Sequence, residues 1–594
     1  MKSKIYKYIL VVLVAMTPLS SCQDYLTVNP VTEYGPDFVF GNVENATKAV
    51  LGVYATLGGD AAYGIRVSMY YPYDNDEMMG QGGTPFPDNE RRDIAHFNVQ
   101  PSNTQLQGPF NQLFSGVERA NICIYYIPKM AGYDSDVELK RLHGESLTLR
   151  AQLYYELIRN WGDVPAQFVP SSFVSDLFLS KTDRDEIYTQ ILSDLAEAEA
   201  LVPWKSEVSG SNERITKGFV HGLRARIALA AGGYSLRSDG TMQRTGNVTE
   251  LYQIAKDAAK AIMDKGDHQL NPSYEAVFKN ALAAHTEEPS GEILFEVGMS
   301  GGNSGNGDSK LGYYNGPRWN ADVSAVGNAA LTVLPTTFYA FDAADQRRDV
   351  TCAIYDLNAN LTVVGRPLQN IVDGKFRRDW ITNPVVVTSG PGVQYFALNW
   401  PMMRYSDVLL MFAEAENELN GPTTEAYEAI NKVRRRGFGK PINTPDATVD
   451  LPAGLSKADF FTAIRKERML ELCGEGIRKY DLIRWNMLGQ RLTEVRAELL
   501  AMEQRTGAYA NLPTTMYFTP GQTSITWLNS FYSPAPAQPA GSTAVNWLPV
   551  GGTNITNTIL TFYASSFTAG KSELLPFHTS SIDANPKLGQ NFGY

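Results

Sequence analysis

Apolar residues recur every three or four positions from Leu147 to about Ile262, and this helical period restricts the fold more than any other feature. They form four stripes: Leu147, Ala151, Tyr154, Ile158 and Trp161; Ile187, Ile191, Leu195 and Ala198; Val220, Leu223, Ile227, Ala230 and Tyr234; Leu251, Ile254, Ala258 and Ile262. The stripes begin roughly 33 to 40 residues apart, close to the repeat of tetratricopeptide-like helical hairpins. We therefore expect a mainly α fold of stacked antiparallel helix pairs.

A second helical block begins at Tyr405 and is interrupted by Gly421-Pro422, a pair that ends one helix and reorients the chain. The apolar positions on the two sides of this break are Val408, Leu409, Phe412 and Leu419, then Ala426, Ala429, Ile430 and Val433. The block therefore predicts another helix pair.

A charged helical stretch follows between roughly Phe460 and Leu500. Glutamates and arginines alternate in it, at positions Glu467, Glu471, Glu475, Arg465, Arg468, Arg478 and Arg484. Spacings of three and four residues bring opposite charges together on a helix, so we expect solvated or interhelical ion pairs.

Two long regions have little helical pattern, one from about Gly298 to Trp400 and one from about Gly507 to the C-terminus. The first opens with the glycine-rich run Gly301 to Gly307. Long irregular segments on a helical scaffold are usually functional loops. We expect the ligand site to draw on them.

The N-terminus has the order of an export signal: three lysines, an apolar run from Tyr8 to Met16, and the small residues before Cys22. Leu19-Ser20-Ser21-Cys22 resembles a bacterial lipobox, in which the cysteine is acylated and becomes the first mature residue. Several fatty chains on Cys22 would anchor the protein stably, since each buried methylene contributes ~0.8 kcal/mol. An ordinary cleaved signal with an incidental cysteine is the alternative.

The charge and cysteine content exclude several classes of protein. Loss of the leader removes three lysines and no acid, so the formal net charge changes from −11 to −14. An acidic surface repels phosphate backbones, so we expect no nucleic-acid ligand. Cys123, Cys352 and Cys473 are widely spaced and predict neither a zinc site nor a disulfide framework.

Four ordered motifs carry a resemblance to a known family. They are residues 149–159 with the exit Gly162-Asp163-Val164-Pro165, residues 404–415 with the helix 426–435, residues 464–485, and the ending 585–594. Gly162 lets the backbone leave a helix and Pro165 prevents the helix from resuming. The four motifs span nearly the whole mature chain, which resembles the SusD/RagB family of outer-membrane lipoproteins.

The resemblance implies a tetratricopeptide-like superhelix with long ligand-binding loops. It divides the chain into a signal peptide (1–21), a tether and N-terminal segment (22–42), an N-terminal helical region (43–290) and a C-terminal region with variable loops (291–594). It also implies lipid anchoring at the cell surface and a SusC-like TonB-dependent transporter as partner. The implied function is non-catalytic capture of glycan for import, and peptide capture, as in the RagB branch, is the alternative.

One cluster of carboxyl side chains is a candidate for catalysis, and it consists of Asp74, Asp76 and Glu77. Glycoside hydrolysis needs two carboxyls facing one another across a cleft, and a surface glycosidase therefore stays open as a third function. The same oxygens suit calcium, but the loop lacks the EF-hand spacing. The six histidines are dispersed without a zinc-type pair, so we expect neither a metal site nor a cofactor.

Sugar binding requires flat aromatic faces together with amides, carboxylates and arginines that bind hydroxyl groups. Two irregular segments supply this mixture and give the predicted ligand contacts. The first contains Tyr313, Tyr314, Arg318, Trp319 and Asn320, and the second contains Tyr73, Asp74 and Phe86, with Tyr70 and Tyr71 beside them. Packing of these side chains on the scaffold is the structural alternative.

Overall fold

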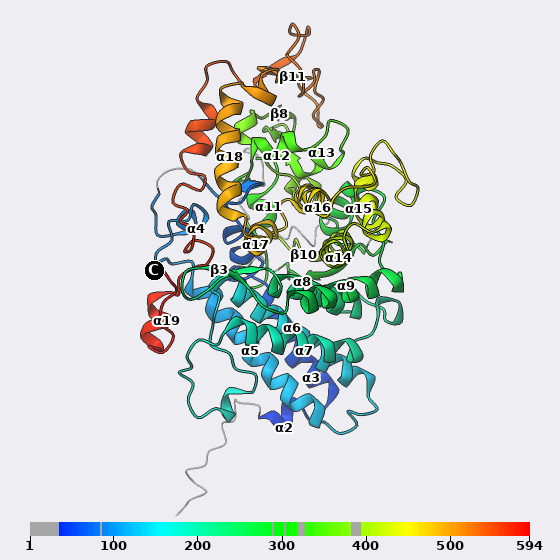
Figure 1. Ribbon diagram of the computed structural model, residues 1–594, viewed down its shortest axis with the longest axis vertical. Helices are drawn as coiled ribbons and strands as arrows, with labels where there is room; N and C mark the ends of the chain where they lie inside the picture. Colours follow the sequence, from blue (N-terminus) through cyan, green and yellow to red (C-terminus); the bar gives the residue numbers. More distant parts are fainter. Residues whose placement is uncertain (1–34, 83–85, 288–289, 302–303, 319–326, 382–393) are drawn as a thin grey trace, which may run out of the picture.

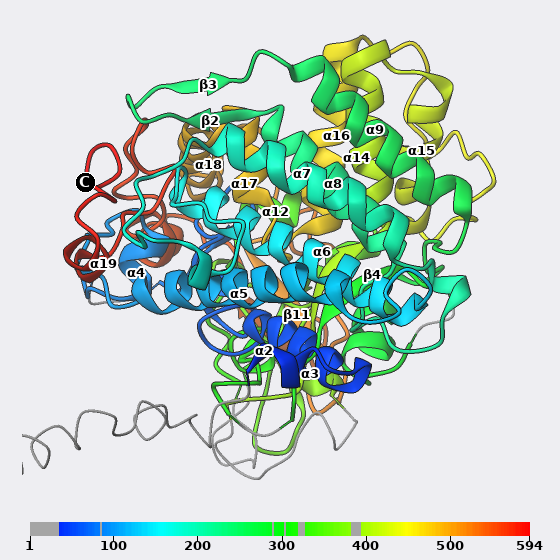
Figure 2. The same cartoon turned by 90° about the horizontal axis from the view of Figure 1, so that it is seen from below.

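The computed structural model describes residues 35–82, 86–287, 290–301, 304–318, 327–381 and 394–594. Its longer helices stack in chain order, each packed against the next (Figures 1 and 2). They are α3 (Val43–Tyr54), α5 (Gln107–Tyr126), α6 (Val137–Trp161), α7 (Arg184–Leu201), α8 (Lys217–Ala231), α9 (Val248–Lys265), α14 (Tyr405–Asn420), α15 (Thr424–Gly437) and α16 (Lys457–Leu472). The predicted mainly α fold of helical hairpins is confirmed.

The four apolar stripes correspond to α6, α7, α8 and α9, with one exception. Tyr234 was expected to continue the third stripe, but α8 ends at Ala231 and Tyr234 begins strand β2 (Tyr234–Leu236). Gly232 and Gly233 follow the helix, and glycine there favours departure from helical geometry. Helix α6 is fixed at its start by Asp136, whose carboxylate accepts from two backbone amides, and at its end by Gly162 at φ +76°.

Helix α14 packs against α9, so the stack continues although a long excursion separates the two helices in sequence. The excursion leaves through β4 (Ile293–Val297) and returns through β10 (Trp400–Arg404). These strands pair antiparallel, with Trp400 opposite Val297. The predicted irregular region is therefore closed at its base by a strand pair.

Inside the excursion, short elements form a small sheet that includes a strand from the N-terminal part. Its order is β1-β5-β9-β6, from Met78–Met79, Thr332–Val333, Val372–Asp373 and Cys352–Ala353. The remaining strand pairs are β2 with β3 (Met242–Arg244), β7 (Tyr355–Leu357) with β8 (Val363–Gly365), and β11 (Thr515–Phe518) with β12 (Thr543–Asn546). The short helices are α2 (Pro36–Val39), α4 (Arg91–Ala95), α10 (Tyr274–Ala276), α11 (Leu311–Tyr314), α12 (Pro335–Ala340), α13 (Arg347–Thr351), α17 (Arg478–Arg484) and α19 (Thr579–Ala584), and α18 (Leu488–Glu503) is longer.

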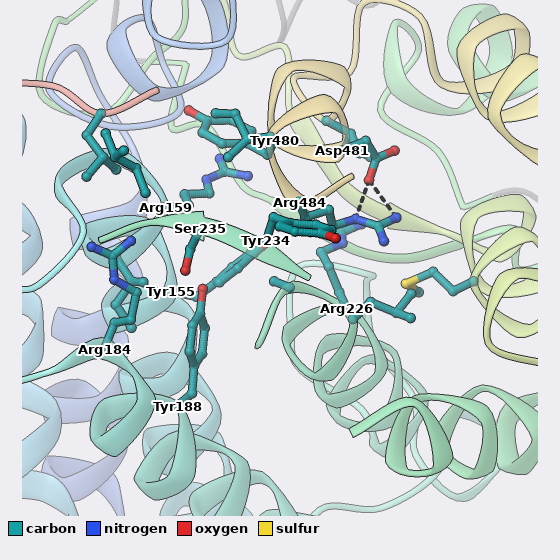
Figure 3. A pocket seen from close by; sticks show the side chains of 18 of the residues that line it. Tyr155, Arg159, Arg184, Tyr188, Arg226, Tyr234, Ser235, Tyr480, Asp481 and Arg484 are labelled. Carbon is teal, nitrogen blue, oxygen red and sulfur yellow. Dashed lines mark hydrogen bonds and ion pairs between the residues drawn. The ribbon is translucent and has the colours of Figure 1, made fainter. Parts of the chain in front are cut away.

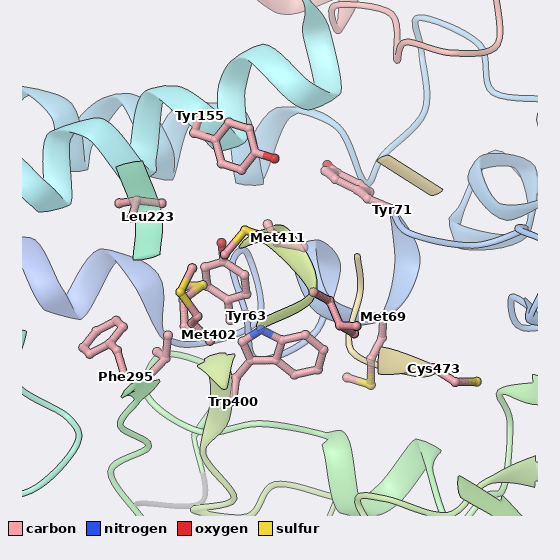
Figure 4. Close-up of a cluster of buried hydrophobic side chains, with 14 of the residues drawn as sticks. Tyr63, Met69, Tyr71, Tyr155, Leu223, Phe295, Trp400, Met402, Met411 and Cys473 are labelled. Carbon is pink, nitrogen blue, oxygen red and sulfur yellow. The ribbon is translucent and has the colours of Figure 1, made fainter. Parts of the chain in front are cut away.

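The core joins segments from all parts of the chain around Trp400 (Figure 4). The indole ring lies nearly parallel to Tyr63 on one side and to Phe376 on another, at centroid distances of 6.3 and 5.4 Å. Such aromatic pairs add to the free energy gained from burial. Cys123, Cys352 and Cys473 are buried free thiols.

Six of the seven charged residues named in the stretch after Phe460 are buried, and the seventh, Arg465, is partly exposed. Glu471 on α16 accepts hydrogen bonds from Arg404 at 2.8 Å and Arg347 at 3.1 Å and also pairs with Arg436. All four side chains are fully buried. Burial alone would oppose ionisation, but the three guanidinium groups outweigh it and hold the pKa of Glu471 well below its usual range. The predicted interhelical pairs exist, and they cross-link α16 to α13, β10 and α15.

Candidate functional site

The structure brings the two predicted aromatic segments together. Tyr314 on α11 lies edge-on to Tyr70, with ring centroids 6.3 Å and hydroxyl oxygens 3.4 Å apart. Both tyrosines are buried, so this pair positions the loop rather than presenting itself to a ligand. Tyr313 belongs to the same short helix, lies edge-on to Tyr314 at 5.1 Å and is half-buried.

Tyr395 lies beside this helix, and the sequence patterns did not single it out. Its hydroxyl donates to Asp60 Oδ2 at 2.8 Å, and Lys310 Nζ lies 4.6 Å from its ring centroid. Burial and the neighbouring Asp60 carboxylate raise the pKa of Tyr395, so the hydroxyl stays protonated and donates at neutral pH. Arg66 pairs with Asp60 at 3.4 Å and donates through Nε to Gln105 at 3.0 Å.

These five residues, Asp60, Arg66, Lys310, Tyr313 and Tyr395, form what we call the tyrosine surface. All five side chains are half-buried, so each is held in place and still reaches solvent. Asp60 Oδ1 is buried and has no hydrogen-bond donor among the described residues. The rings of Tyr313 and Tyr395 beside two cations that reach solvent, Arg66 and Lys310, are a combination that binds the rings and hydroxyl groups of sugars.

The other predicted contacts of the first segment lie at its end. Arg318 is exposed, and its backbone amide donates to Asp356 Oδ1 at 2.8 Å. Trp319 and Asn320 lie outside the described residues. Phe86, from the second segment, is half-buried and edge-on to His96 and Phe562 at 5.3 and 6.2 Å. Its ring therefore packs largely on the scaffold.

Tyr73 and Asp74 were predicted as ligand contacts, but the structure places both in the interior, with 1% and 0% of their surface exposed. Asp74 Oδ2 lies 3.0 Å from His96 Nδ1 and accepts from the Ala564 amide at 2.7 Å, while Oδ1 accepts from Gly80. A buried carboxylate with these partners has no surface to offer a sugar. Ala564 lies 490 positions from Asp74 in the chain, and the local sequence does not reveal such a contact.

The neighbouring carboxyls are equally buried. Asp76 accepts two hydrogen bonds from Arg478, at 2.7 and 2.9 Å, and one from Arg491 at 3.2 Å. Burial opposes its ionisation, but the two arginines outweigh it and lower the pKa of Asp76. Burial raises the pKa of Glu77 to about 8. Since Asp74, Asp76 and Glu77 all have no exposed surface, they do not form the cleft that a glycosidase requires.

Among the described residues, no helix combines the length and the apolar composition required to cross a bilayer. Among them, no three or more His, Cys, Asp or Glu side chains come together in a group that could hold a metal ion.

The fold and the loop-borne surface define a class of protein in which a superhelical scaffold carries irregular ligand-binding segments. The model of the SusD family matches residues 374–594, and the model described as "Starch-binding associating with outer membrane" matches residues 87–229. The chain belongs to the SusD/RagB family.

Relatives and solved structures agree with this assignment. SusD-like proteins P2 and P25 of Formosa agariphila are each 25% identical to the chain. The match to P2 covers 80% of this chain and 90% of P2. The match to P25 covers 79% of this chain and 88% of P25. The crystal structure of a SusD homolog from Bacteroides thetaiotaomicron superposes with a TM-score of 0.75 at 25% identity, covering 94% of this chain and 98% of that one. Surface glycan-binding protein A of the same species, in complex with laminarihexaose, shares the fold at a TM-score of 0.60 and 20% identity, with 92% and 99% coverage.

Proposed function

We propose that the chain is a non-catalytic glycan-binding lipoprotein of the cell surface, which delivers oligosaccharide or polysaccharide to a SusC-like TonB-dependent transporter. The tyrosine surface carries this proposal, because it places the half-buried rings of Tyr313 and Tyr395 beside the cations of Arg66 and Lys310. The laminarihexaose complex of a protein with this fold supports the ligand class. Cys22, the proposed anchor, lies outside the described residues.

The first prediction concerns this surface. Tyr395→Ala and Tyr313→Ala are each expected to weaken glycan binding about tenfold, since loss of one stacking ring costs roughly 1–1.5 kcal/mol. The measurement is a glycan array followed by calorimetry on the mature chain without its acylated cysteine, with laminarin as the first probe and Trp319→Ala as a third variant.

The matched control is Tyr125→Ala, which removes a partly exposed tyrosine from α5. It should bind as the wild type does. Unchanged glycan affinity in both tyrosine variants would place the site elsewhere, and absence of any glycan ligand for the folded protein would favour peptide capture. Release of reducing sugar from a bound polysaccharide would contradict the non-catalytic assignment.

A second surface suits the transporter. Exposed apolar side chains lie on α2, α3 and the first part of the segment between α6 and α7, namely Phe38, Leu51, Val169 and Phe173. Ring contacts connect these parts, with Phe173 4.6 Å from Tyr125 and Phe40 5.2 Å from Tyr126. A groove of about 740 Å³ lies between α2, α3 and α5. We call this the apolar end, and Figure 1 places it where the described chain begins.

The position of Cys22 favours a membrane-embedded partner for the apolar end. The residues between Cys22 and Gly35 span at most ~45 Å when fully extended, so an acylated Cys22 would keep this end near the bilayer. Exposed apolar patches of this kind mark interaction sites. The transporter is the partner that fits both the location and the chemistry.

The second prediction tests the apolar end. Phe38→Asp combined with Phe173→Asp should abolish co-purification of the lipoprotein with its transporter from outer membranes, because two charges would be buried in an apolar contact. Glycan affinity of the isolated variant should not change. Val550→Asp, at a residue that is 77% exposed in the C-terminal region, is the control. Retained co-purification of the double variant would assign the transporter contact to another face.

A further inference from the structure

A cavity separate from the tyrosine surface lies between the helical stack and the C-terminal part of the chain (Figure 3). The side chains that matter for its chemistry come from three elements: Tyr155 and Arg159 from α6, Arg184 and Tyr188 from α7, and Tyr234 and Ser235 from β2. We call it the arginine–tyrosine cavity. Its far wall is formed by α17, where the Tyr480 ring lies 4.1 Å from the Arg159 guanidinium carbon.

Both arginines keep hydrogen-bond donors free. Arg159 donates through Nε to Glu156 at 2.7 Å, and Arg184 donates through Nε to Asp163 at 2.7 Å. No acceptor among the described residues takes a hydrogen bond from the Nη atoms of either group. Arg184 is 3% exposed and lines the cavity, so its free donors are largely screened from bulk solvent. An acceptor bound in the cavity would take these donors.

The residues that follow α6 position Arg184 in the cavity. A Cβ atom at Gly162 would stand 2.5 Å from Arg184 Nη2, so a side chain there would displace the guanidinium from its present position. The next residue, Asp163, accepts from both Nε and the backbone amide of Arg184. Asp163 therefore fixes the Nε side of the Arg184 guanidinium, and Gly162 leaves space beside Nη2.

Hydroxyl groups complete the donor set. The side-chain oxygens of Tyr155, Tyr188, Tyr234 and Ser235 have no hydrogen-bond partner in the part of the chain that the structure describes. Tyr155 and Tyr188 are 5% and 7% exposed, and burial raises the pKa of both, so they stay protonated. Figure 3 shows the Tyr188 hydroxyl directed toward the strand that carries Tyr234 and Ser235.

The carboxylates near these donors are already paired. Glu156 pairs with Arg159, and Asp163 pairs with Arg184. Asp481 also lines the cavity, but its two oxygens accept from Arg468 at 2.7 Å and Arg484 at 2.8 Å. Arg226, a further lining residue, donates to Asp407 at 2.6 Å and keeps Nε without a partner among the described residues. The interior therefore presents guanidinium and hydroxyl donors without acceptors in the described part of the chain, and guanidinium donors favour an anionic acceptor.

The volume limits the size of that anion. The cavity measures about 60 Å³. One water needs roughly 10–15 Å³ by the same measure, so there is space for about four to six water-sized groups. A tetrahedral oxyanion has that size, whereas a hexose has more than twice as many heavy atoms. We propose that the arginine–tyrosine cavity binds one free oxyanion of the phosphate or sulfate class, which links α6 and α7 to β2.

Calorimetry with inorganic phosphate on the mature chain tests the proposal, alongside thermal unfolding in phosphate and in chloride at equal ionic strength. The wild type should bind one phosphate saturably, and its melting temperature should rise in phosphate only. Tyr188→Phe combined with Ser235→Ala removes two hydroxyls and keeps the apolar packing, and it should weaken phosphate binding at least tenfold. Arg184→Gln should abolish binding. Tyr125→Phe removes an outside hydroxyl and should have no effect.

Three results would overturn the assignment. They are equal stabilisation by chloride and phosphate, wild-type phosphate affinity in a folded Tyr188→Phe/Ser235→Ala protein, and equal affinity for glucose 6-phosphate, whose ring exceeds the cavity. Circular dichroism establishes that each variant is folded.

Discussion

Replacing Glu471 by glutamine is expected to lower the free energy of unfolding by about 3–5 kcal/mol, because it removes a buried counter-charge that three buried arginines share. Glu471 is the shared partner of Arg347, Arg404 and Arg436, all of which have no exposed side-chain surface. Glutamine keeps the shape and one acceptor oxygen but removes the negative charge. The loss therefore measures charge compensation rather than packing.

Urea unfolding followed by circular dichroism gives this free energy from the midpoint and the slope. Glu44→Gln is the matched control, since the Glu44 side chain is 80% exposed and pairs only with Lys48 one helical turn away. It should leave the midpoint unchanged. Equal midpoints for wild type and Glu471→Gln would contradict this account. They would mean that Glu292 and Glu475, which also pair with Arg404, balance the charge of that arginine without Glu471.

Acidification is expected to produce the other large effect, a steep loss of stability below about pH 5. Burial opposes ionisation of Asp407, but Arg468 and Arg226 outweigh it and lower its pKa to about 2. The pKa values of Asp76, Glu471, Glu475 and Asp481 are lowered in the same way. As the pH falls through the ordinary carboxyl range, the unfolded chain therefore binds more protons than the folded protein does, and each such carboxylate loses its contribution to the free energy of unfolding. For Asp407 alone this contribution is roughly 2 kcal/mol, at 1.36 kcal/mol per pKa unit.

Urea unfolding at a series of pH values between about 7 and 3 measures this loss. Asp407→Asn should be less stable than the wild type near neutrality and should lose less on acidification, because the titrating group is gone. Burial raises the pKa of Glu77 to about 8 and of Asp373 to about 7, so these two groups act in the opposite direction and reduce stability as the pH rises toward 8. A wild type whose stability stays constant down to pH 4 would contradict the account of the buried pairs.

The helical hairpins could be predicted because their signal is local. The stripes that became α6 to α9 repeat within one or two turns, so the period alone reveals them. The burial of Asp76 could not be predicted, since its partner Arg478 lies 402 positions away. The tyrosine surface is an intermediate case. Tyr313 was found from its glycine-rich surroundings, and Tyr395, which follows Gly390 and Gly392, carries the same signal, whereas its contact with Asp60 depends on the fold.

The strand pair of β4 and β10 has an evolutionary consequence. It joins both ends of the excursion at one fixed point of the scaffold, with Trp400 opposite Val297. Lengthening a loop with fixed ends costs only about 0.6 kcal/mol per doubling of its length. Insertions and deletions in residues 298–399 therefore change the free energy of folding little. Ligand preference can diversify between lineages while the helical stack and its apolar end stay the same.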